Sequence, residues 1–391
     1  MQITGRHYAT GALVTVELDK DRIRRIQATD GNDAADSSAA AWLAPGFVDL
    51  QINGYGGQEF NDLDLTPDKV SQVTMAQDAT GVTSYLPTST THSFEVISHG
   101  LATIARACDG DRNTSARIAG VHLEGPYLSP EDGPRGAHPR EHIRPPDWDE
   151  FRRFQDAAGG RIRILTVSPE HEGAAEFIRQ VVSSGVVVAI GHTAANSQQI
   201  EAAVDAGASM STHLGNGAHG KIDRHHNYIW DQLADDRLVA SLIADGHHLP
   251  PAVIKSFVRG KTPERCVLVS DMMGMGGLPP GLYENTSVGA IEILESGRLV
   301  VAGQRQYLAG AALPMAYGVA NVMRFAGVNL KTAIDMSTGW PAKIISSEAG
   351  VLDEGAPADL ILFDLPADEE ITSPLQIRAT IKNGEVVHGE A

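Results

Sequence analysis

The stretch His122-Leu123-Glu124-Gly125-Pro126 ends an apolar run, Ala116 to Leu123, that is typical of a short buried strand. Three more polar strings stand at the ends of similar runs: Gly191-His192-Thr193 after Val186 to Ile190, Thr212-His213-Leu214 after Ala208 to Ser211, and Ser270-Asp271 after Cys266 to Ser270. In a (β/α)8 barrel the carboxyl ends of all strands meet on one face, where the following loops build the functional site. The four strings therefore predict one shared site at that face of a barrel.

The middle of the chain supplies enough strands for such a barrel. Between Ala44 and about Pro341, strand-like runs alternate with amphipathic helical patterns such as 172–183 and 197–206. Four further strand-like runs cover residues 46–50, 82–87, 161–167 and 238–243, which brings the number to eight. This alternation predicts an α/β protein with a TIM-like (β/α)8 barrel. A doubly wound open sheet is the alternative, but Gly54-Tyr55-Gly56-Gly57 is not followed by the helix that a phosphate-binding loop requires.

Both ends of the chain have sequence patterns that are typical of β-strands. Strand-like runs cover 11–18 and 22–26 near the N-terminus and 359–364 and 379–387 near the C-terminus, the last with a hairpin signal at Asn383-Gly384. We expect residues 1–43 and 345–391 to form one small β-sandwich domain beside a barrel of residues 44–344. Two unrelated edge extensions of the barrel are the alternative.

Composition narrows the class of protein. The 391 residues are 42% hydrophobic and 20% charged, as in a soluble globular protein. The net charge of −18 argues against binding nucleic acid or an anionic membrane as the main activity, since both need a basic face. Cys108 and Cys266 lack paired spacing, so we expect neither a disulfide framework nor a cysteine-based zinc site. Without an apolar stretch of about 20 residues, the expected location is cytoplasmic.

The polar strings carry the residue types of a catalytic metal site. Histidine nitrogen and carboxylate oxygen bind borderline cations such as Zn²⁺, and a catalytic site keeps one position open. The predicted ligands are Glu124, His192 and His213. Amidohydrolase barrels often carry His-x-His on the first strand, where this chain has Gln51 and Asn53, and neutral amides are poor ligands for such cations. We therefore expect one divalent ion per chain, with Zn²⁺ preferred and Fe²⁺, Co²⁺ or Mn²⁺ as alternatives; four unrelated structural polar residues are the competing interpretation.

Several strings, taken together, resemble one family. They are Pro45 to Gly54, His122 to Tyr127, Gly191-His192-Thr193, Thr212-His213-Leu214, Ala244-Asp245-Gly246, Leu308-Ala309-Gly310 and Gly355 to Leu360. In this order and spacing, from about residue 44 to 364, the chain resembles the N-acetylglucosamine-6-phosphate deacetylases of the amidohydrolase superfamily. The resemblance implies a barrel with a small β-sandwich, a homodimer, and hydrolysis of N-acetylglucosamine 6-phosphate to glucosamine 6-phosphate and acetate.

The resemblance also implies roles for single residues. Asp271 would take a proton from the attacking water and pass it to the leaving amine, and His138 would help to stabilise the oxyanion at the scissile carbonyl. The substrate-binding positions that it implies are Gln51, Ala137, Asn216, Gly217, Arg224, His248 and Leu308. Arg224 falls where the family has an arginine that reaches the phosphate of the neighbouring subunit's substrate.

Departures from the family pattern gather at the substrate end. Asn216-Gly217-Ala218 replaces Asn-Ala-Met, the segment from His219 to Trp230 is unlike the family's, and Met272 to Gly277 replaces Ala-Thr. Another N-acyl substrate therefore stays open, either an unphosphorylated N-acetylhexosamine or N-acetylgalactosamine 6-phosphate. A cyclic-amide or deaminase-type hydrolase is disfavoured by Gln51 and Asn53, and a metal-stabilised binding protein without activity is the remaining alternative.

Overall fold

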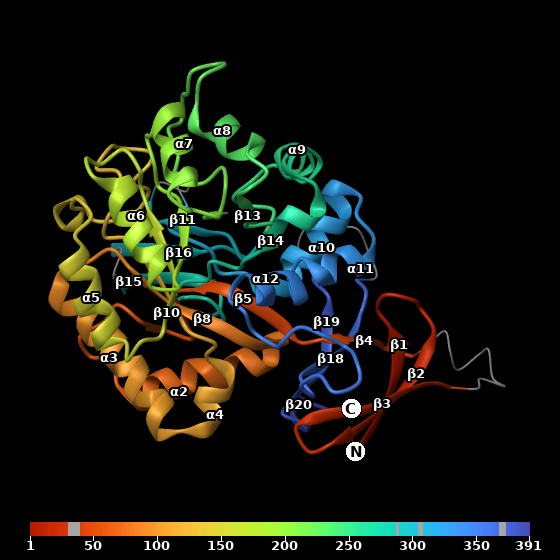
Figure 1. Ribbon diagram of the computed structural model, residues 1–391. Coiled ribbons are helices and arrows are strands. Elements are labelled where there is room, and N and C mark those ends of the chain that lie inside the picture. Colours follow the sequence, from red (N-terminus) through yellow and green to blue (C-terminus); the bar gives the residue numbers. More distant parts are fainter. Residues whose placement is uncertain (30–39, 287–288, 304–307, 367–372) are drawn as a thin grey trace.

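Eight parallel strands form the centre of the computed structural model, which describes residues 1–29, 40–286, 289–303, 308–366 and 373–391 (Figure 1). The strands are β5 (Phe47–Ile52), β8 (Val82–Thr90), β9 (Val121–Glu124), β10 (Ile162–Val167), β11 (Val187–Ile190), β12 (Met210–Ser211), β13 (Val239–Leu242) and β14 (Cys266–Leu268). Each pairs with the next in chain order, and every one overlaps a run that the sequence predicts as a strand. The predicted α/β barrel is confirmed.

The ends of β14 and β5 meet and close the barrel. The backbone N–H of Asp271 donates to the carbonyl of Gln51 at 3.0 Å, and that of Asn53 donates to the carbonyl of Met272 at 2.7 Å. The closure is therefore made by the segments that carry two predicted site residues, Gln51 and Asp271.

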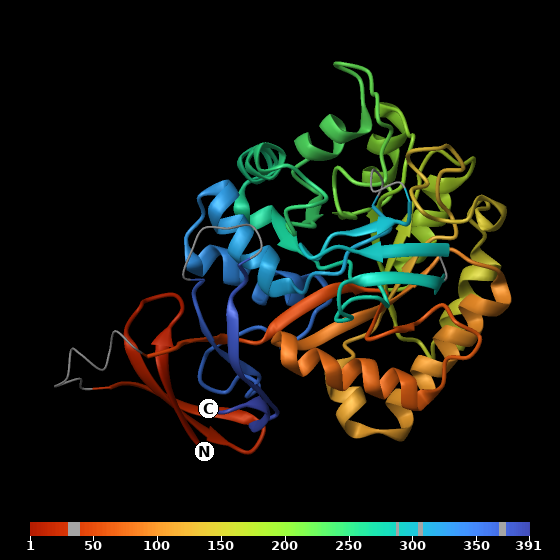
Figure 2. The same ribbon diagram turned by 180° about the vertical axis from the view of Figure 1, so that it is seen from behind.

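Helices surround the strands (Figures 1 and 2). They are α2 (Pro67–Ala76), α3 (Phe94–Gly110), α4 (Arg112–Arg117), α5 (Trp148–Ala157), α6 (Ala174–Ser183), α7 (Ser197–Asp205), α8 (Tyr228–Ala234), α9 (Pro251–Lys261), α10 (Met315–Ala326), α11 (Leu330–Asp335) and α12 (Gly339–Ile344), with 3-10 turns η1 (Gln77–Thr80), η2 (Arg140–His142) and η3 (Pro263–Arg265). The sequence patterns at 172–183 and 197–206 predict α6 and α7 to within two residues. Asn196 caps α7 through a capping box with Gln199, and α6 buries Phe177, Ile178 and Val181.

Strands from both termini form one seven-stranded sheet beside the barrel (Figure 2). Its order is β20 (Glu385–Gly389), β19 (Gln376–Lys382), β18 (Leu360–Asp364), β4 (Trp42–Pro45), β1 (Gln2–His7), β2 (Leu13–Asp19) and β3 (Arg22–Ala28). Val16 and Leu43 share one core with Leu360 and Ile381. One β unit built from both termini is thus confirmed, and its hairpin turns at Asn383-Gly384 with φ of 52° and 77°. The limits 1–43 and 345–391 stay predictions.

Two small β elements lie between the barrel strands and helices. The hairpin of β6 (Gly54–Tyr55) and β7 (Gln58–Glu59) follows β5, and a three-stranded sheet of β15 (Gly281–Thr286), β16 (Gly289–Ile293) and β17 (Leu299–Val301) follows β14. The sequence patterns considered above do not predict this sheet, although Ile291-Glu292-Ile293 alternates with period two. Among the described residues, no helix has the length and apolar character needed to cross a bilayer.

Candidate metal and catalytic site

Three strand ends bring Glu124, His192 and His213 together inside the barrel. Glu124 ends β9, and the two histidines follow β11 and β12. Oε1 of Glu124 lies 3.2 Å from Nε2 of His192 and 3.0 Å from Nε2 of His213, and the two Nε2 atoms are 3.1 Å apart. All three side chains are buried, and among the described residues they form the group that could hold a metal ion.

The donor set fits a divalent cation. One carboxylate and two imidazoles are ligands that Zn²⁺, Fe²⁺, Co²⁺ and Mn²⁺ all accept. Nδ1 of His192 donates to the carbonyl of Pro134 at 2.8 Å, so the lone pair of its Nε2 points toward Glu124. Two imidazole nitrogens and a carboxylate oxygen converge here, and only a proton or a cation between them relieves the repulsion of their lone pairs. These residues could therefore hold a metal ion.

The electrostatics favour an ionised carboxylate in this cluster. Burial raises the pKa of Glu124, but the hydrogen bonds and charges of His192 and His213 outweigh burial and bring that pKa well below its ordinary value. Burial lowers the pKa of His213, and the Glu124 carboxylate more than compensates and raises it. A carboxylate that stays charged is what a cation needs as a ligand.

Two glycines hold the imidazole of His192 from different loops. Gly136 lies after β9 with φ of +57°, and Gly217 lies after β12 with φ of +55°. A Cβ atom on Gly217 would come within 2.5 Å of Nδ1 of His192, and one on Gly136 within 3.1 Å of Cε1. Gly217, predicted to bind substrate, thus packs against a ligand of the predicted metal.

The predicted proton shuttle contacts the amide of Asn53, the residue directly after β5. Asp271 follows β14, and its Oδ1 accepts a hydrogen bond of 2.8 Å from Nδ2 of Asn53. Nε2 of Gln51 donates to Oε1 of Glu124 at 3.1 Å, so the buried Gln51 amide serves a carboxylate of the cluster. Burial and the charge of Glu124 raise the pKa of Asp271.

The backbone is in the left-handed region at Asp271 (φ +51°), His192 (+50°) and His213 (+29°). This conformation costs energy in residues other than glycine and is found most often at functional sites.

A polar layer inside the barrel supports the cluster and was missed by sequence reasoning. Nδ1 of His122 donates to the carbonyl of Leu50 at 3.2 Å, and its Nε2 accepts from Oγ1 of Thr166 at 2.7 Å. Oγ1 of Thr166 lies 2.7 Å from that of Thr212, the residue before His213. Burial lowers the pKa of His122 to about 4, so this imidazole is neutral. The signal was its position two residues before Glu124, since alternate residues of a strand share a face.

Four loops carry the predicted substrate residues His138, Ala137, Asn216, Gly217, His248 and Leu308. His138 is buried with Nε2 at 3.3 Å from Nε2 of His192, and burial lowers its pKa to about 3; Ala137 is exposed beside it. Asn216 and Gly217 line a small cavity next to His192. Nδ1 of His248 contacts Oδ2 of Asp245 at 2.7 Å. Leu308 is half-buried and bridges to Val300 of β17.

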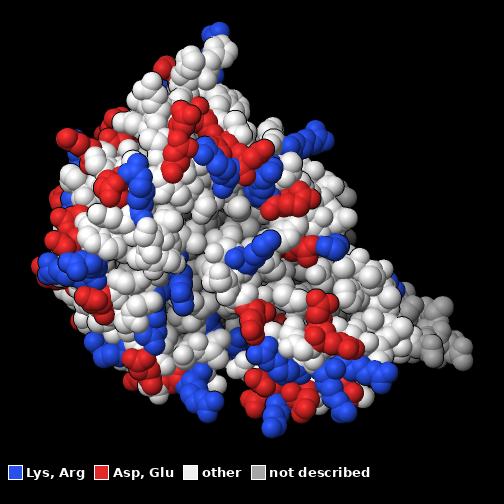
Figure 3. Space-filling model, in the orientation of Figure 1, with Lys and Arg blue, Asp and Glu red and all other residues white. Residues whose placement is uncertain are grey.

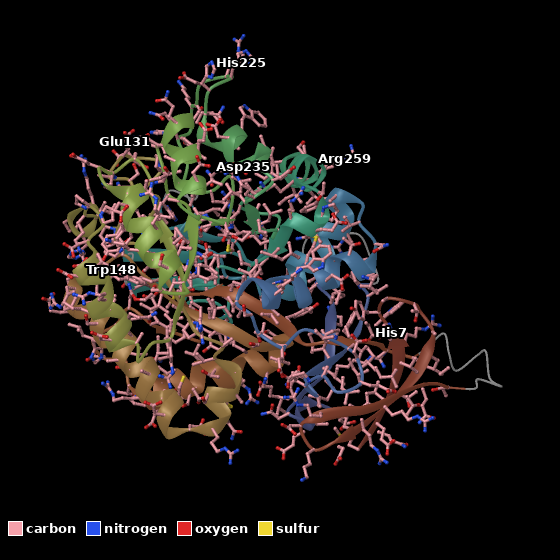
Figure 4. The ribbon with its side chains drawn as sticks, viewed as in Figure 1. His7, Glu131, Trp148, His225, Asp235 and Arg259 are labelled. Atoms are coloured by element: carbon pink, nitrogen blue, oxygen red, sulfur yellow. The ribbon has the colours of Figure 1, made fainter. Side chains whose placement is uncertain are left out.

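Arg224 lies apart from these residues, in an exposed loop of residues 219–226 that projects from the body. Figure 4 labels His225 on this projecting loop, and Figure 3 shows basic atoms at its tip, whereas acidic and basic side chains are interspersed on the rest of that face. Two hydrogen bonds hold the backbone of this loop. Nε1 of Trp230 donates to the carbonyl of Arg224 at 3.2 Å, and Nδ2 of Asn227 donates to the carbonyl of Asp223 at 2.7 Å. Arg224 is exposed on this loop, directly before His225.

Comparisons of the sequence and of the structure relate this chain to known proteins. A sequence model of the amidohydrolase family matches residues 42–387. The chain is 34% identical over 327 residues to N-acetylgalactosamine-6-phosphate deacetylase of Escherichia coli O157:H7, covering 83% of this chain and 84% of that protein. It is also 34% identical over 360 residues to N-acetylglucosamine-6-phosphate deacetylase of Bos taurus, covering 88% and 83%. The crystal structure of N-acetyl-D-glucosamine-6-phosphate deacetylase from Mycobacterium smegmatis is similar with a TM-score of 0.86 and 30% identity, covering 99% of this chain and 100% of that one.

Proposed function

The chain belongs to the amidohydrolase family, and from that premise we propose that it hydrolyses N-acetylglucosamine 6-phosphate to glucosamine 6-phosphate and acetate. The observation that carries the proposal is the buried group of Glu124, His192 and His213 with Asp271 beside it. The curated relatives at 34% identity are deacetylases of amino-sugar 6-phosphates, and a mutant of the mycobacterial relative is known in complex with N-acetyl-D-glucosamine-6-phosphate. A linear amide bond between carbon and nitrogen is the bond broken.

We propose one divalent cation per chain, with Zn²⁺ preferred, held by Glu124, His192 and His213. When bound, such a cation polarises a carbonyl and makes water a better nucleophile. The side-chain amides of Gln51 and Asn53 do not compete for it, because Gln51 donates to Glu124 and Asn53 donates to Asp271.

The protons are moved by the protein's own side chains. Asp271 accepts a proton from the attacking water while the water oxygen forms a bond to the acetyl carbon. The neutral imidazole of His138 can donate an N–H to the oxygen of that carbonyl, where negative charge develops. Asp271 then returns the proton to the amide nitrogen, the carbon–nitrogen bond breaks, and the amine and acetate leave.

Sugar recognition is assigned to the loops around the cluster, with Asn216, Gly217 and His248 as polar contacts and Ala137 and Leu308 as apolar ones. For the phosphate we propose Arg224 of a second copy in a homodimer. Arg224 is exposed on the projecting loop, and Ile222 and Trp230 near it expose 40% and 49% of their surface, as an interface between copies would require.

N-acetylgalactosamine 6-phosphate is the second candidate substrate. It is favoured by the relative in Escherichia coli O157:H7, whose name states that substrate, and by the unusual sequence of the projecting loop. The deciding experiment measures acetate release from N-acetylglucosamine and N-acetylgalactosamine, each with and without a 6-phosphate. The proposal expects the highest kcat/KM for N-acetylglucosamine 6-phosphate; acetate release from none of the four sugars would contradict it.

A further inference from the structure

Asn53 makes two contacts with Asp271 and one with Met272, the next residue, where the ends of β5 and β14 meet. Its Nδ2 donates to Oδ1 of the Asp271 carboxylate at 2.8 Å and lies 3.4 Å from the Asp271 carbonyl oxygen. Its backbone N–H donates to the carbonyl of Met272 at 2.7 Å, directly after Asp271. The carboxylate is therefore fixed to β5 by a side chain, while the peptide on its carboxyl side is fixed by the backbone.

This arrangement makes the two oxygens of the carboxylate unequal. Oδ1 is occupied by the amide of Asn53, whereas Oδ2 has no hydrogen bond to any residue in the described part of the chain. An N–H donor stabilises a carboxylate oxygen that carries negative charge and cannot accept a proton from it. The free oxygen is the one that can gain and lose a proton without breaking this contact.

We propose that Asn53 is a positioning residue that reserves Oδ2 of Asp271 for the proton transferred during catalysis. The inference rests on the proposed function, because it needs Asp271 to act as the shuttle. A shuttle that serves as base and then as acid has to face two reacting atoms in succession, and a carboxylate free to rotate about its χ2 bond would lose that orientation.

The charged and titratable groups around Asp271 make the Asn53 contact important. Glu124 and Asp49 add negative charge near Asp271, whereas His213 and His248 favour its ionised form. The amide of Asn53 also favours the ionised carboxylate. Removing it should leave Asp271 both less well oriented and harder to ionise.

The test compares Asn53→Ala and Asn53→Asp with the wild-type enzyme loaded with Zn²⁺. We expect each to lower kcat by about ten- to a hundredfold, because a badly oriented shuttle loses part of the roughly 10²–10⁴-fold that general acid–base catalysis supplies, with KM changed less than about threefold and metal content unchanged. The acidic limb of the kcat–pH profile should move to higher pH in Asn53→Ala and further in Asn53→Asp, which adds a like charge beside Asp271. A merely structural asparagine would not produce this graded shift.

Asn61→Ala is the matched control. Asn61 lies two residues after β7, and its amide donates to the Thr90 carbonyl at 2.7 Å rather than to Asp271. Its substitution should lower stability without moving the pH profile.

The inference is overturned if the Asn53 variants keep the wild-type pH profile, or if they lose activity only in proportion to lost metal. Asp271→Asn separates the two ideas: an active Asp271→Asn enzyme contradicts the proposed shuttle itself, whereas an inactive one with unaffected Asn53 variants contradicts only the role of Asn53.

Discussion

The side-chain amide of Gln51 donates to Oε1 of Glu124 at 3.1 Å, the same oxygen that lies within 3.2 Å of both cluster histidines. One strand of the barrel therefore offers this carboxylate a hydrogen-bond donor. A ligand on β5 would be needed to hold a second cation against Glu124, and the amide nitrogen of Gln51 cannot serve as one because it carries protons.

The first prediction is a single tightly held divalent ion per chain. Elemental analysis of protein purified without added metal should give about one equivalent, following the donor count of a mononuclear site. His213→Asn should lower that content together with activity, because it removes one ligand. His225→Asn is the control, since His225 is exposed on the projecting loop. Two equivalents that survive dialysis would show that the site is binuclear.

The second prediction concerns the packing of Gly217 on His192. In Gly217→Ala, the new Cβ would lie 2.5 Å from Nδ1 of His192 at a φ of +55°, so the imidazole or the loop has to move. We expect metal affinity to fall at least about tenfold, since small displacements of a ligand lose much of its bond, and stability to fall by about 1 kcal/mol from backbone strain.

Competition with a chelator measures that affinity, and Gly220→Ala is its control. Gly220 is in the same loop region, but a Cβ there would meet no atom within 4 Å. Equal metal affinity in both variants would contradict the view that the glycine is needed for the position of His192.

The strands and the cluster could be predicted from sequence because both depend on local patterns. Buried strands appear as short apolar runs, and the polar residues at their ends contrast with them, so the sequence alone predicts Glu124, His192 and His213 as a group. The roles of Gln51 and Asn53 depended on partners 73 and 218 positions away. Only the closure of the barrel determines which carboxylate each amide meets.

Loops and insertions were less predictable. The sheet of β15 to β17 has short strands with weak alternation, so its period-two signal was not separable from an ordinary loop. The loop backbone at Asp223 and Arg224 is held by hydrogen bonds from Asn227 and Trp230. Such contacts leave no periodic trace in the sequence.

The third prediction is a pH dependence of stability that comes from Asp49. Its carboxylate is fully buried and accepts N–H bonds from Gln51 at 3.1 Å and Ser270 at 3.2 Å. Burial raises its pKa from the ordinary 3.8 to about 7. Between these values the folded protein keeps a proton that the unfolded chain has lost, so stability falls as pH rises from about 4 to about 7, by up to about 1.4 kcal/mol per pH unit.

Asp49→Asn removes this contribution while it leaves every other titrating group in place. The difference in free energy of unfolding between the wild-type protein and the variant, measured with denaturant from pH 4.5 to 8, should shift in favour of the variant as pH rises to about 7 and then become constant. A difference that does not depend on pH would mean that Asp49 is ionised throughout this range.

The last prediction concerns Arg224 and the phosphate. A guanidinium binds phosphate through two parallel N–H bonds, which a lysine ammonium cannot reproduce. Arg224→Lys should therefore raise KM for the 6-phosphorylated substrate by more than about tenfold and leave KM for the free sugar nearly unchanged. Arg259→Lys, on the exposed face of α9, is the control for general effects of removing a guanidinium.

Because the proposed contact crosses between copies, mixing Arg224→Lys with an Asp271→Asn variant should form heterodimers in which one site has intact Asp271 and receives the partner's intact Arg224. Such mixtures should regain low KM for the phosphorylated sugar. No change in KM for Arg224→Lys, or no recovery on mixing, would show that Arg224 does not bind the phosphate across the dimer.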